Sequence, residues 1–277
     1  MPLVLMCVLT VPAQCQPSGT RETVVIRNNT LNLRALLWRP HGRRPFPAVL
    51  LNHGSGRSRQ ELERLGPYEQ NADRLGPVFA RHGYLFLFLF RRGIGLSADQ
   101  GASAVDVMNS EFAARGQEGR NALQLELLER DMTDAVAGLA YLRALADVDV
   151  RRIALVGHSF GGSLTLLMAE HEPNLRALVI FSGAGLSWDR SPQLRARLLP
   201  AMPRIAAPVL FIHAANDHSV SAGKTLAAER QRLGKPHLLK IYPALGHTPE
   251  EGHDFIYLGV SRWERDVFAF LDEHMRR

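Results

Sequence analysis

The segment that decides the fold is Ile153-Ala154-Leu155-Val156-Gly157-His158-Ser159-Phe160-Gly161-Gly162. A short apolar, β-prone run ends at a serine that stands between two glycines, and an apolar helical run follows. The pattern G-x-S-x-G between strand and helix predicts a sharp turn, in which side chains at Gly157 and Gly161 would clash. The turn holds the hydroxyl of Ser159 clear of the sheet, and the helix behind it directs its positive end toward that hydroxyl. Ser159 is therefore the candidate nucleophile.

Length and composition indicate the class of protein. The chain has 277 residues, of which 46% are hydrophobic and 22% charged, and this suits one well-buried globular domain. The formal net charge is +6, but the arginines are scattered in pairs such as Arg43-Arg44 and Arg151-Arg152. The sequence contains no basic stripe with interleaved aromatic residues, so it does not indicate nucleic-acid binding.

The N-terminal segment differs in composition from the rest of the chain. Residues 3–11 form an apolar run broken by Thr10, and the small-residue stretch Val11-Pro12-Ala13 is typical of a signal-peptide cleavage site. Nine residues are too few to span a bilayer, and no Lys or Arg precedes Arg21. We expect residues 1–20 to be a secretory signal or a disordered segment and residues 21–277 to form the folded domain. On this interpretation the protein is periplasmic or secreted; a start codon placed too early would leave it cytoplasmic.

Cysteine usage and glycine patterns bear on cofactors. Both cysteines, Cys7 and Cys15, lie within residues 1–20, so the predicted domain contains none. This excludes disulfides, thiol catalysis and thiolate metal sites from the domain. The sequence also lacks the glycine patterns of dinucleotide-binding and phosphate-binding loops. We expect neither a cofactor nor a bound metal.

Short apolar runs alternate with helical patterns along the chain. Strands are expected at residues 23–26, 31–37, 48–52, 84–90, 153–157, 177–181, 209–214 and 238–242. Helices are expected at residues 70–82, 123–145, 159–170, 224–233 and 261–274. This alternation predicts an α/β fold with a mostly parallel, doubly wound sheet flanked by helices.

Two connections are long. Residues 93–121 show little regular pattern, and they follow a strand end, where such sheets bind ligands. This connection, with Met108 and Phe112, is either a wall of the binding pocket or a solvated loop. Residues 182–207 have room for one short helix, at about residues 191–199, but not for a large cap domain. We therefore expect an open active site.

A nucleophilic serine requires a base and an acid that orients the base. In this strand–turn–helix arrangement the acid follows the serine in the chain and the histidine comes last. Asp217 comes after the buried strand at residues 209–214 and a short small-residue exit, and it is the candidate acid. Asp189 comes too early, and Asp254 adjoins the histidine region itself.

Two histidines, His247 and His253, lie between the last strand and the last helix, where the base is expected. We favour His253 because Phe255 can anchor its loop in apolar surroundings and Gly252 allows a tight turn before it. His247 precedes a polar turn, at residues 248–251, that is typical of solvated loops. Three further histidines are interpreted as structural: His53, His158 and His213.

An oxyanion formed at Ser159 needs two backbone N–H donors. One is expected from Phe160, the residue after the nucleophile. The other is expected from the loop His53-Gly54-Ser55-Gly56, which follows the third strand. Ser55 is the first choice there and Gly54 the second. These glycines would serve equally in a tight turn without any such role.

From about Thr23 onward the chain resembles the α/β-hydrolase superfamily, and more narrowly its dienelactone hydrolase and prolyl-oligopeptidase-like group. The resemblance rests on Asn52-His53-Gly54-Ser55, Arg91-Arg92-Gly93-Ile94-Gly95-Leu96-Ser97, the Gly157–Gly162 turn, Asn216-Asp217, Glu251-Gly252-His253-Asp254-Phe255, Trp263 and Asp266-Val267-Phe268-Ala269-Phe270-Leu271. It implies the α/β-hydrolase fold, and in the small members of this group a Gly-His-x-Phe tail carries the base. Dienelactone hydrolases proper have a cysteine nucleophile where this chain has Ser159. The resemblance therefore implies serine esterase or small-peptidase chemistry.

The leading hypothesis is a cofactor-free serine hydrolase of carboxylic esters, which acts through an acyl-enzyme with Ser159, His253 and Asp217. A peptidase or an acyltransferase that uses the same acyl-enzyme is the alternative within enzymes. A catalytically silent hydrolase fold that binds a ligand is the alternative outside them. The expected partner is a small-molecule ester or peptide substrate, with no nucleic acid and no membrane span.

Overall fold

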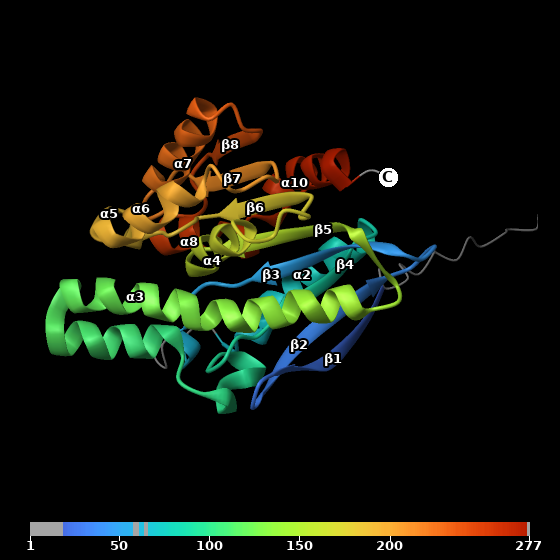
Figure 1. Cartoon of the computed structure of the whole chain (residues 1–277), viewed down its shortest axis with the longest axis horizontal. Coiled ribbons are helices and arrows are strands. Elements are labelled where there is room, and N and C mark those ends of the chain that lie inside the picture. Colours follow the sequence, from blue (N-terminus) through green and yellow to red (C-terminus); the bar gives the residue numbers. More distant parts are fainter. Residues whose placement is uncertain (1–18, 58–60, 64–65, 276–277) are drawn as a thin grey trace, which may run out of the picture.

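The computed structural model describes residues 19–57, 61–63 and 66–275. Its centre is an eight-stranded sheet with the strand order β1-β2-β4-β3-β5-β6-β7-β8 (Figure 1). The β1–β2 and β2–β4 pairs are antiparallel, and the other five pairs are parallel. The strands are β1 (Gly19–Asn28), β2 (Leu31–Pro40), β3 (Phe46–Asn52), β4 (Leu85–Leu89), β5 (Val148–His158), β6 (Ala177–Phe181), β7 (Val209–Ala214) and β8 (His237–Tyr242).

Helices cover both faces of the sheet. The helices are α2 (Glu69–Arg81), α3 (Ala104–Ala144), α4 (Phe160–Ala169), α5 (Leu186–Arg190), α6 (Pro192–Leu198), α7 (Ser221–Arg232), α8 (Pro249–His253), α9 (Phe255–Leu258) and α10 (Val260–Met275), with short 3-10 turns η1 (Gly95–Gln100) and η2 (Leu199–Ala201). One apolar cluster joins the sheet to α3, α4, α6 and α7, and a second joins its other face to α2, α9 and α10. The central strands are buried on both faces, which explains their continuous apolar sequences. The predicted fold class, with no large cap domain, is confirmed.

The expectation of an irregular connection at residues 93–121 is wrong. η1 and the first half of α3 occupy most of it, and Ser103 caps the N-terminus of α3 through its hydroxyl. Gly116 (φ 69°, ψ −161°) interrupts the helical backbone, so α3 consists of two helical segments that meet at this glycine. Only glycine readily adopts this backbone conformation. The first segment lies beside the second in Figure 1 and forms part of the cover over the strand ends.

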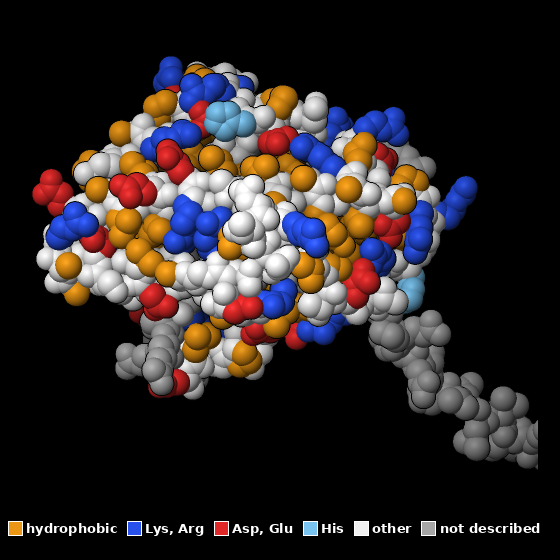
Figure 2. All heavy atoms as spheres, turned by 60° about the horizontal axis from the view of Figure 1, so that its bottom comes forward, with side chains coloured by type: hydrophobic (Ala, Val, Ile, Leu, Met, Phe, Trp, Pro, Cys, Tyr) orange, Lys and Arg blue, Asp and Glu red, His pale blue; other side chains and the backbone are white. Residues whose placement is uncertain are grey.

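The predicted N-terminal segment, residues 1–20, lies almost wholly outside the described residues. Gly19 and Thr20 are exceptions, because β1 begins at Gly19 and pairs along its whole length with β2. β1 thus begins two residues before the predicted boundary at residue 21. None of the helices within the described ranges has the length and apolar character needed to cross a membrane. On the face drawn in Figure 2, basic and acidic side chains are intermixed, so the positive net charge is not gathered into one stripe there.

Candidate active site

Ser159 stands between the end of β5 and the start of α4 with φ 53° and ψ −119°, a backbone conformation that is strained for a residue with a side chain. The neighbouring glycines make this possible. A Cβ on Gly157 would lie 2.5 Å from the carbonyl oxygen of Gly161, and a Cβ on Gly161 would overlap the carbonyl oxygen of Asn52. Both glycines are therefore required by close backbone approach, as the sequence pattern predicts.

A chain of hydrogen bonds links the three predicted site residues. Nε2 of His253 lies 2.8 Å from Oγ of Ser159, and Nδ1 of the same ring lies 2.7 Å from Oδ1 of Asp217. Ser159 comes from the β5–α4 turn, Asp217 follows β7, and His253 ends α8. With a proton on Nδ1 bound to the carboxylate, Nε2 is free to accept the hydroxyl proton of Ser159. The arrangement can thus activate Ser159 as a nucleophile.

Asp217 is held by two histidines. Its other oxygen, Oδ2, lies 2.8 Å from Nδ1 of His213 in β7, and its carboxylate is fully buried. Burial alone would raise the pKa of the Asp217 carboxyl, but the hydrogen bonds from His213 and His253 outweigh burial and hold this pKa well below its usual range. Asp217 therefore stays ionised and keeps a fixed orientation toward His253.

The backbone carbonyl of His253 is fixed by two side chains. Its carbonyl oxygen lies 2.9 Å from Nε2 of His158 and accepts a hydrogen bond of 3.0 Å from the hydroxyl of Ser182. Burial, together with the nearby His253, lowers the pKa of His158 to about 3. His158 is therefore neutral near pH 7, with its proton on Nε2, and adds no charge beside His253.

His247 lies elsewhere on the loop. It is exposed, and its backbone N–H donates to Oε2 of Glu251, which also takes part in the capping box of α8 with Thr248. Asn216 ties this loop to the turn that carries Asp217, through hydrogen bonds with Leu245 and Thr248. Gly252 packs so closely on Asn216 that a Cβ would lie 2.6 Å from its carbonyl carbon. Phe255, the predicted anchor, is fully buried.

The two residues predicted to supply the oxyanion donors line the same cavity as the nucleophile. Ser55 and Phe160 line one cavity together with Ser159 and His253. Within the part of the chain that the structure describes, the backbone N–H groups of Ser55 and Phe160 have no hydrogen-bond acceptor. They are therefore available to a negatively charged oxygen. Gly54, the second choice for this role, lines the neighbouring cavity.

Two cavities, of about 190 and 180 Å³, meet at Ser159 and share Ser55, His218 and His253. The first extends over the loop after β3 toward Asp254. The second extends between α3 and α5, and Met108, from the predicted pocket wall, lines it, whereas Phe112 is exposed.

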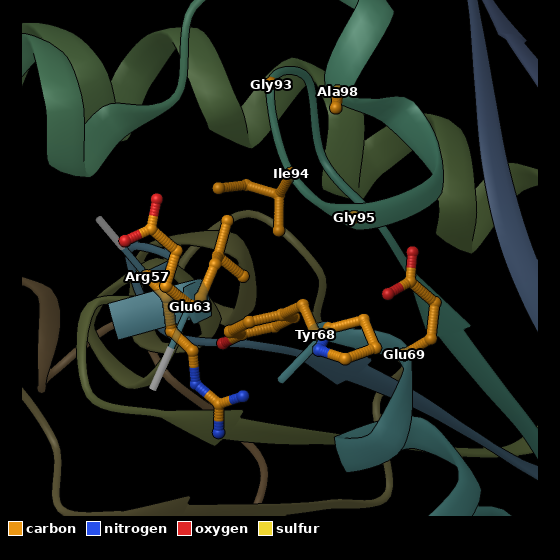
Figure 3. A pocket seen from close by; sticks show the side chains of 10 residues that line it. Arg57, Glu63, Tyr68, Glu69, Gly93, Ile94, Gly95 and Ala98 are labelled. Carbon is orange, nitrogen blue, oxygen red and sulfur yellow. The ribbon is translucent and has the colours of Figure 1, made fainter. Parts of the chain in front are cut away.

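A larger cavity, of about 540 Å³, lies beside this site but does not reach Ser159. Arg57 and Tyr68 line both this cavity and the first active-site cavity. Figure 3 shows Ile94 pointing toward the ring of Tyr68 across the larger cavity.

Sequence reasoning missed several residues at these cavities. His218 follows Asp217 directly and has its ring 5.1 Å from that of His253. Arg120 and Gln124 of α3 and Arg190 of α5 line the second cavity. Adjacency to Asp217 was an available signal for His218. Arg120 and Arg190 lie in the two long connections, Gln124 lies in the helix expected at residues 123–145, and none of the three carried a motif.

Comparison with known proteins places the chain in a family. A family model described as the dienelactone hydrolase family matches residues 33–254. The chain belongs to the dienelactone hydrolase family. The resemblance stated from the sequence is thus confirmed, and the chain has the α/β-hydrolase fold.

Solved structures share the fold at low sequence identity. The dienelactone hydrolase of Anabaena variabilis is 18% identical with a TM-score of 0.64, and the match covers 94% of this chain and 100% of that one. The acylaminoacyl peptidase of Pyrococcus horikoshii is 17% identical with a TM-score of 0.65, and the match covers 94% of this chain and 42% of that one. At these identities the likeness concerns the fold alone.

A curated relative in Methylorubrum extorquens, provisionally named carboxymethylenebutenolidase, is 26% identical over 119 residues. The match covers 42% of this chain and 40% of the relative, so it spans about two fifths of the relative's length. Among the described residues, no cluster of three or more His, Cys, Asp or Glu side chains is arranged to hold a metal ion.

Proposed function

We propose that this protein is a serine hydrolase that cleaves carboxylic esters through an acyl-enzyme on Ser159. The observation that carries the proposal is the unbroken hydrogen-bonded chain from Ser159 through His253 to Asp217, which opens onto two cavities. Each group has the state that its role needs. Asp217 is ionised, and His253 is oriented at both nitrogens. Ser159 lines a cavity with Ser55 and Phe160, whose backbone N–H groups have no acceptor among the described residues.

The reaction follows from this geometry. His253 Nε2 takes the hydroxyl proton as Ser159 Oγ attacks the ester carbonyl carbon, and the N–H groups of Ser55 and Phe160 stabilise the negative oxygen. The tetrahedral intermediate collapses, its C–O bond to the alcohol breaks, and His253 returns the proton to the departing alcohol. Water then attacks the acyl-enzyme with His253 as base, and this step releases the carboxylic acid and restores Ser159.

The names of the relatives support hydrolysis at an acyl carbon. One is named for a lactone, which is a cyclic ester, and another for the peptide-type bond of acylamino acids. We favour esters because an alcohol leaves more readily than an amine, so ester cleavage asks less of the general acid His253. A peptidase or an acyltransferase would use the same acyl-enzyme and is the second candidate.

Replacement of the nucleophile tests the proposal. The Ser159→Ala variant should lose at least about 10³-fold in kcat for p-nitrophenyl butyrate and should remain folded. The wild-type protein should be labelled at Ser159 by a fluorophosphonate, which intact-protein and peptide mass spectrometry detect. Near-normal turnover by Ser159→Ala, measured in protein purified from an esterase-free host, would move the chemistry away from this serine.

A substrate panel separates the alternatives. Hydrolysis of p-nitrophenyl esters well above that of aminoacyl p-nitroanilides is expected of an esterase, and the reverse order would favour a peptidase. A folded wild-type protein that is neither labelled by the fluorophosphonate nor active on either class would instead be a silent, ligand-binding member of the family.

A further inference from the structure

The carbonyl group of Gly54, in the loop after β3, is held by two donors. Nη2 of Arg91 lies 2.6 Å from this oxygen, and Nδ1 of His53 lies 2.7 Å from it. His53 follows β3 and Arg91 lies two residues after the end of β4, so the two donors stand at the ends of neighbouring strands of the sheet. Together they fix the direction in which the Gly54 carbonyl points.

The direction of that carbonyl sets the direction of an N–H group. In a trans peptide unit the C=O and the N–H point opposite ways, and the unit between Gly54 and Ser55 carries the carbonyl of the first and the N–H of the second. With the Gly54 oxygen bonded to Arg91 and His53, the Ser55 N–H points away from them. Ser55 lines the cavity that contains Ser159 and Phe160, where this N–H has an open path to a substrate oxygen.

The protonation of His53 agrees with this arrangement. Its Nε2 accepts the backbone N–H of Arg91 at 3.2 Å, so its proton lies on Nδ1, which donates to Gly54. Burial, with the adjacent charge of Arg91, lowers the pKa of His53 well below its usual value. His53 is therefore neutral and keeps this tautomer across the working pH range.

The guanidinium of Arg91 is buried, and removing its charge from water is unfavourable for the free energy of folding. It is 1% exposed, its Nε binds Oδ2 of Asp131 at 3.2 Å, and its Nη1 has no partner among the described residues. A buried pair of this kind contributes little net stability, because desolvation offsets the attraction. The guanidinium also lies 5.5 Å from the ring centre of Phe160, the residue that carries the second unpaired N–H. Arg91 thus contacts Phe160 and the carbonyl of the peptide unit that carries the Ser55 N–H.

We propose that Arg91 and His53 are positioning residues that hold the Gly54–Ser55 peptide with its N–H toward the ester oxygen. This inference rests on the proposed function. If the peptide turned over, the Gly54 carbonyl oxygen would face the cavity and would repel the oxyanion. Asp131 keeps Arg91 in place from α3, and so links this helix to the catalytic step.

The test compares an ester with its sulfur analogue. A thionoester develops its negative charge on sulfur, a weak hydrogen-bond acceptor, so it gains little from the N–H donors. In Arg91→Met we expect kcat for p-nitrophenyl butyrate to fall at least about tenfold with little change in KM. The rate with O-p-nitrophenyl thionobutyrate should fall much less, so the ester-to-thionoester ratio decreases.

Two further variants keep the test decisive. Arg92→Met removes the neighbouring arginine, which pairs with Asp134 and makes no contact with Gly54, and its rate ratio should match wild type. His53→Phe preserves a ring stacked on Phe88 but removes the Nδ1–H donor, and its ratio should also decrease, even if Arg91→Met does not fold.

The outcomes are distinct. If both Arg91→Met and His53→Phe keep the wild-type ester-to-thionoester ratio, because the two substrates lose rate equally or not at all, the positioning role is overturned. The proposed function is then left intact. Failure of the wild-type protein to be labelled at Ser159 would overturn the proposed function itself, and the positioning role with it.

Discussion

At the scale of single residues, the carboxylate of Asp217 has a histidine on each oxygen. The Asp217→Asn change keeps the shape but places an NH2 group where an acceptor stood. His253 then loses both its preferred tautomer and the partner of its charged form. We expect kcat to fall by about 10³–10⁴-fold with the fold retained, measured by steady-state ester hydrolysis and circular dichroism. Retention of most of the activity would assign the role to another carboxylate.

The two loop histidines can be separated by matched changes. His253→Ala should abolish fluorophosphonate labelling of Ser159, because the variant has no base within hydrogen-bond distance of Oγ. His247→Ala should be labelled at nearly the wild-type rate, since the imidazole of His247 lies on the exposed loop. The rate of labelling is read by mass spectrometry over time. The opposite pattern would make His247 the base.

The order of residues in the chain was enough to select Ser159 and Asp217, because the turn and the strand ends each leave a recognisable local pattern. Chain order left His247 beside His253, and only the neighbouring Gly252 and Phe255 favoured His253. His158 and His213 were expected to be structural, yet both touch the site through His253 or Asp217. The bond from His158 joins residues 95 positions apart. Such a contact depends on how α8 packs against the end of β5, and the local sequence does not indicate it.

At the scale of elements, α3 and α5 bring two positive charges to the second cavity. Neither Arg120 nor Arg190 has a hydrogen-bonding or ion-pair partner for its guanidinium among the described residues. Gln124 beside them is 2% exposed, and its Oε1 is also unpaired. Burial, and then the charge of Arg190, lowers the pKa of Arg120, which means that both effects disfavour the charged guanidinium of Arg120. An anion bound in this cavity would stabilise that charge.

We therefore expect the enzyme to prefer esters that carry a carboxylate. The value of kcat/KM for mono-p-nitrophenyl adipate should exceed that for p-nitrophenyl hexanoate by about tenfold or more, as a charge-assisted hydrogen bond provides. The Arg120→Gln/Arg190→Gln double variant should lose this preference. Arg265→Gln, which removes an exposed charge on α10, should keep it. Equal preference in all three proteins would leave these arginines without a role in substrate selection.

The first half of α3 is a helix that the sequence pattern did not predict. Gly116 and Gly119 lie close together there, and because glycine lowers helix propensity the sequence of this segment shows little helical pattern. In the structure Gly116 is a joint between two helical segments, and Gly119 packs against Glu111 and Arg115 of the preceding one. Contact between the two segments stabilises a helix that its own sequence only weakly favours.

At the scale of the whole molecule, buried neutral histidines make stability depend on pH. The pKa of His158 is about 3 in the folded protein and near 6.5 when the chain is unfolded, so the unfolded chain binds more protons between these values. The free energy of unfolding therefore decreases as the pH falls below 6.5, by about 1.4 kcal/mol per pH unit for one such histidine. His53, also shifted downward, acts in the same direction.

Urea denaturation at pH 7 and pH 5 measures this effect. The loss of stability on acidification should be smaller in His158→Gln than in wild type by about 2 kcal/mol, because glutamine keeps a donor for the His253 carbonyl but does not titrate. The remaining loss in the variant comes from groups that both proteins share. An identical loss in both proteins would show that His158 is already protonated in the folded state at pH 5.

The architecture as a whole was predictable because parallel strands buried on both faces leave unmistakable apolar runs such as Leu85–Leu89. The order of the strands in the sheet and the length of β1 could not be predicted from the sequence, because pairing between distant segments determines both. The sheet order also explains why the site residues follow β3, β5 and β7. β3 and β5 are neighbours and only β6 separates β5 from β7, so the residues that follow these three strands lie together at one end of the sheet.

The two cavities that meet at Ser159 bear on how products depart. In the proposed reaction, an ester bound across Ser159 would be divided where the two cavities join, and each fragment would remain in its own cavity. The alcohol can leave while the acyl group is still attached, and its vacated compartment then receives either water or a second alcohol. The ratio of hydrolysis to transesterification thus depends on which molecule fills the empty compartment, and an added alcohol would divert the acyl group into a new ester.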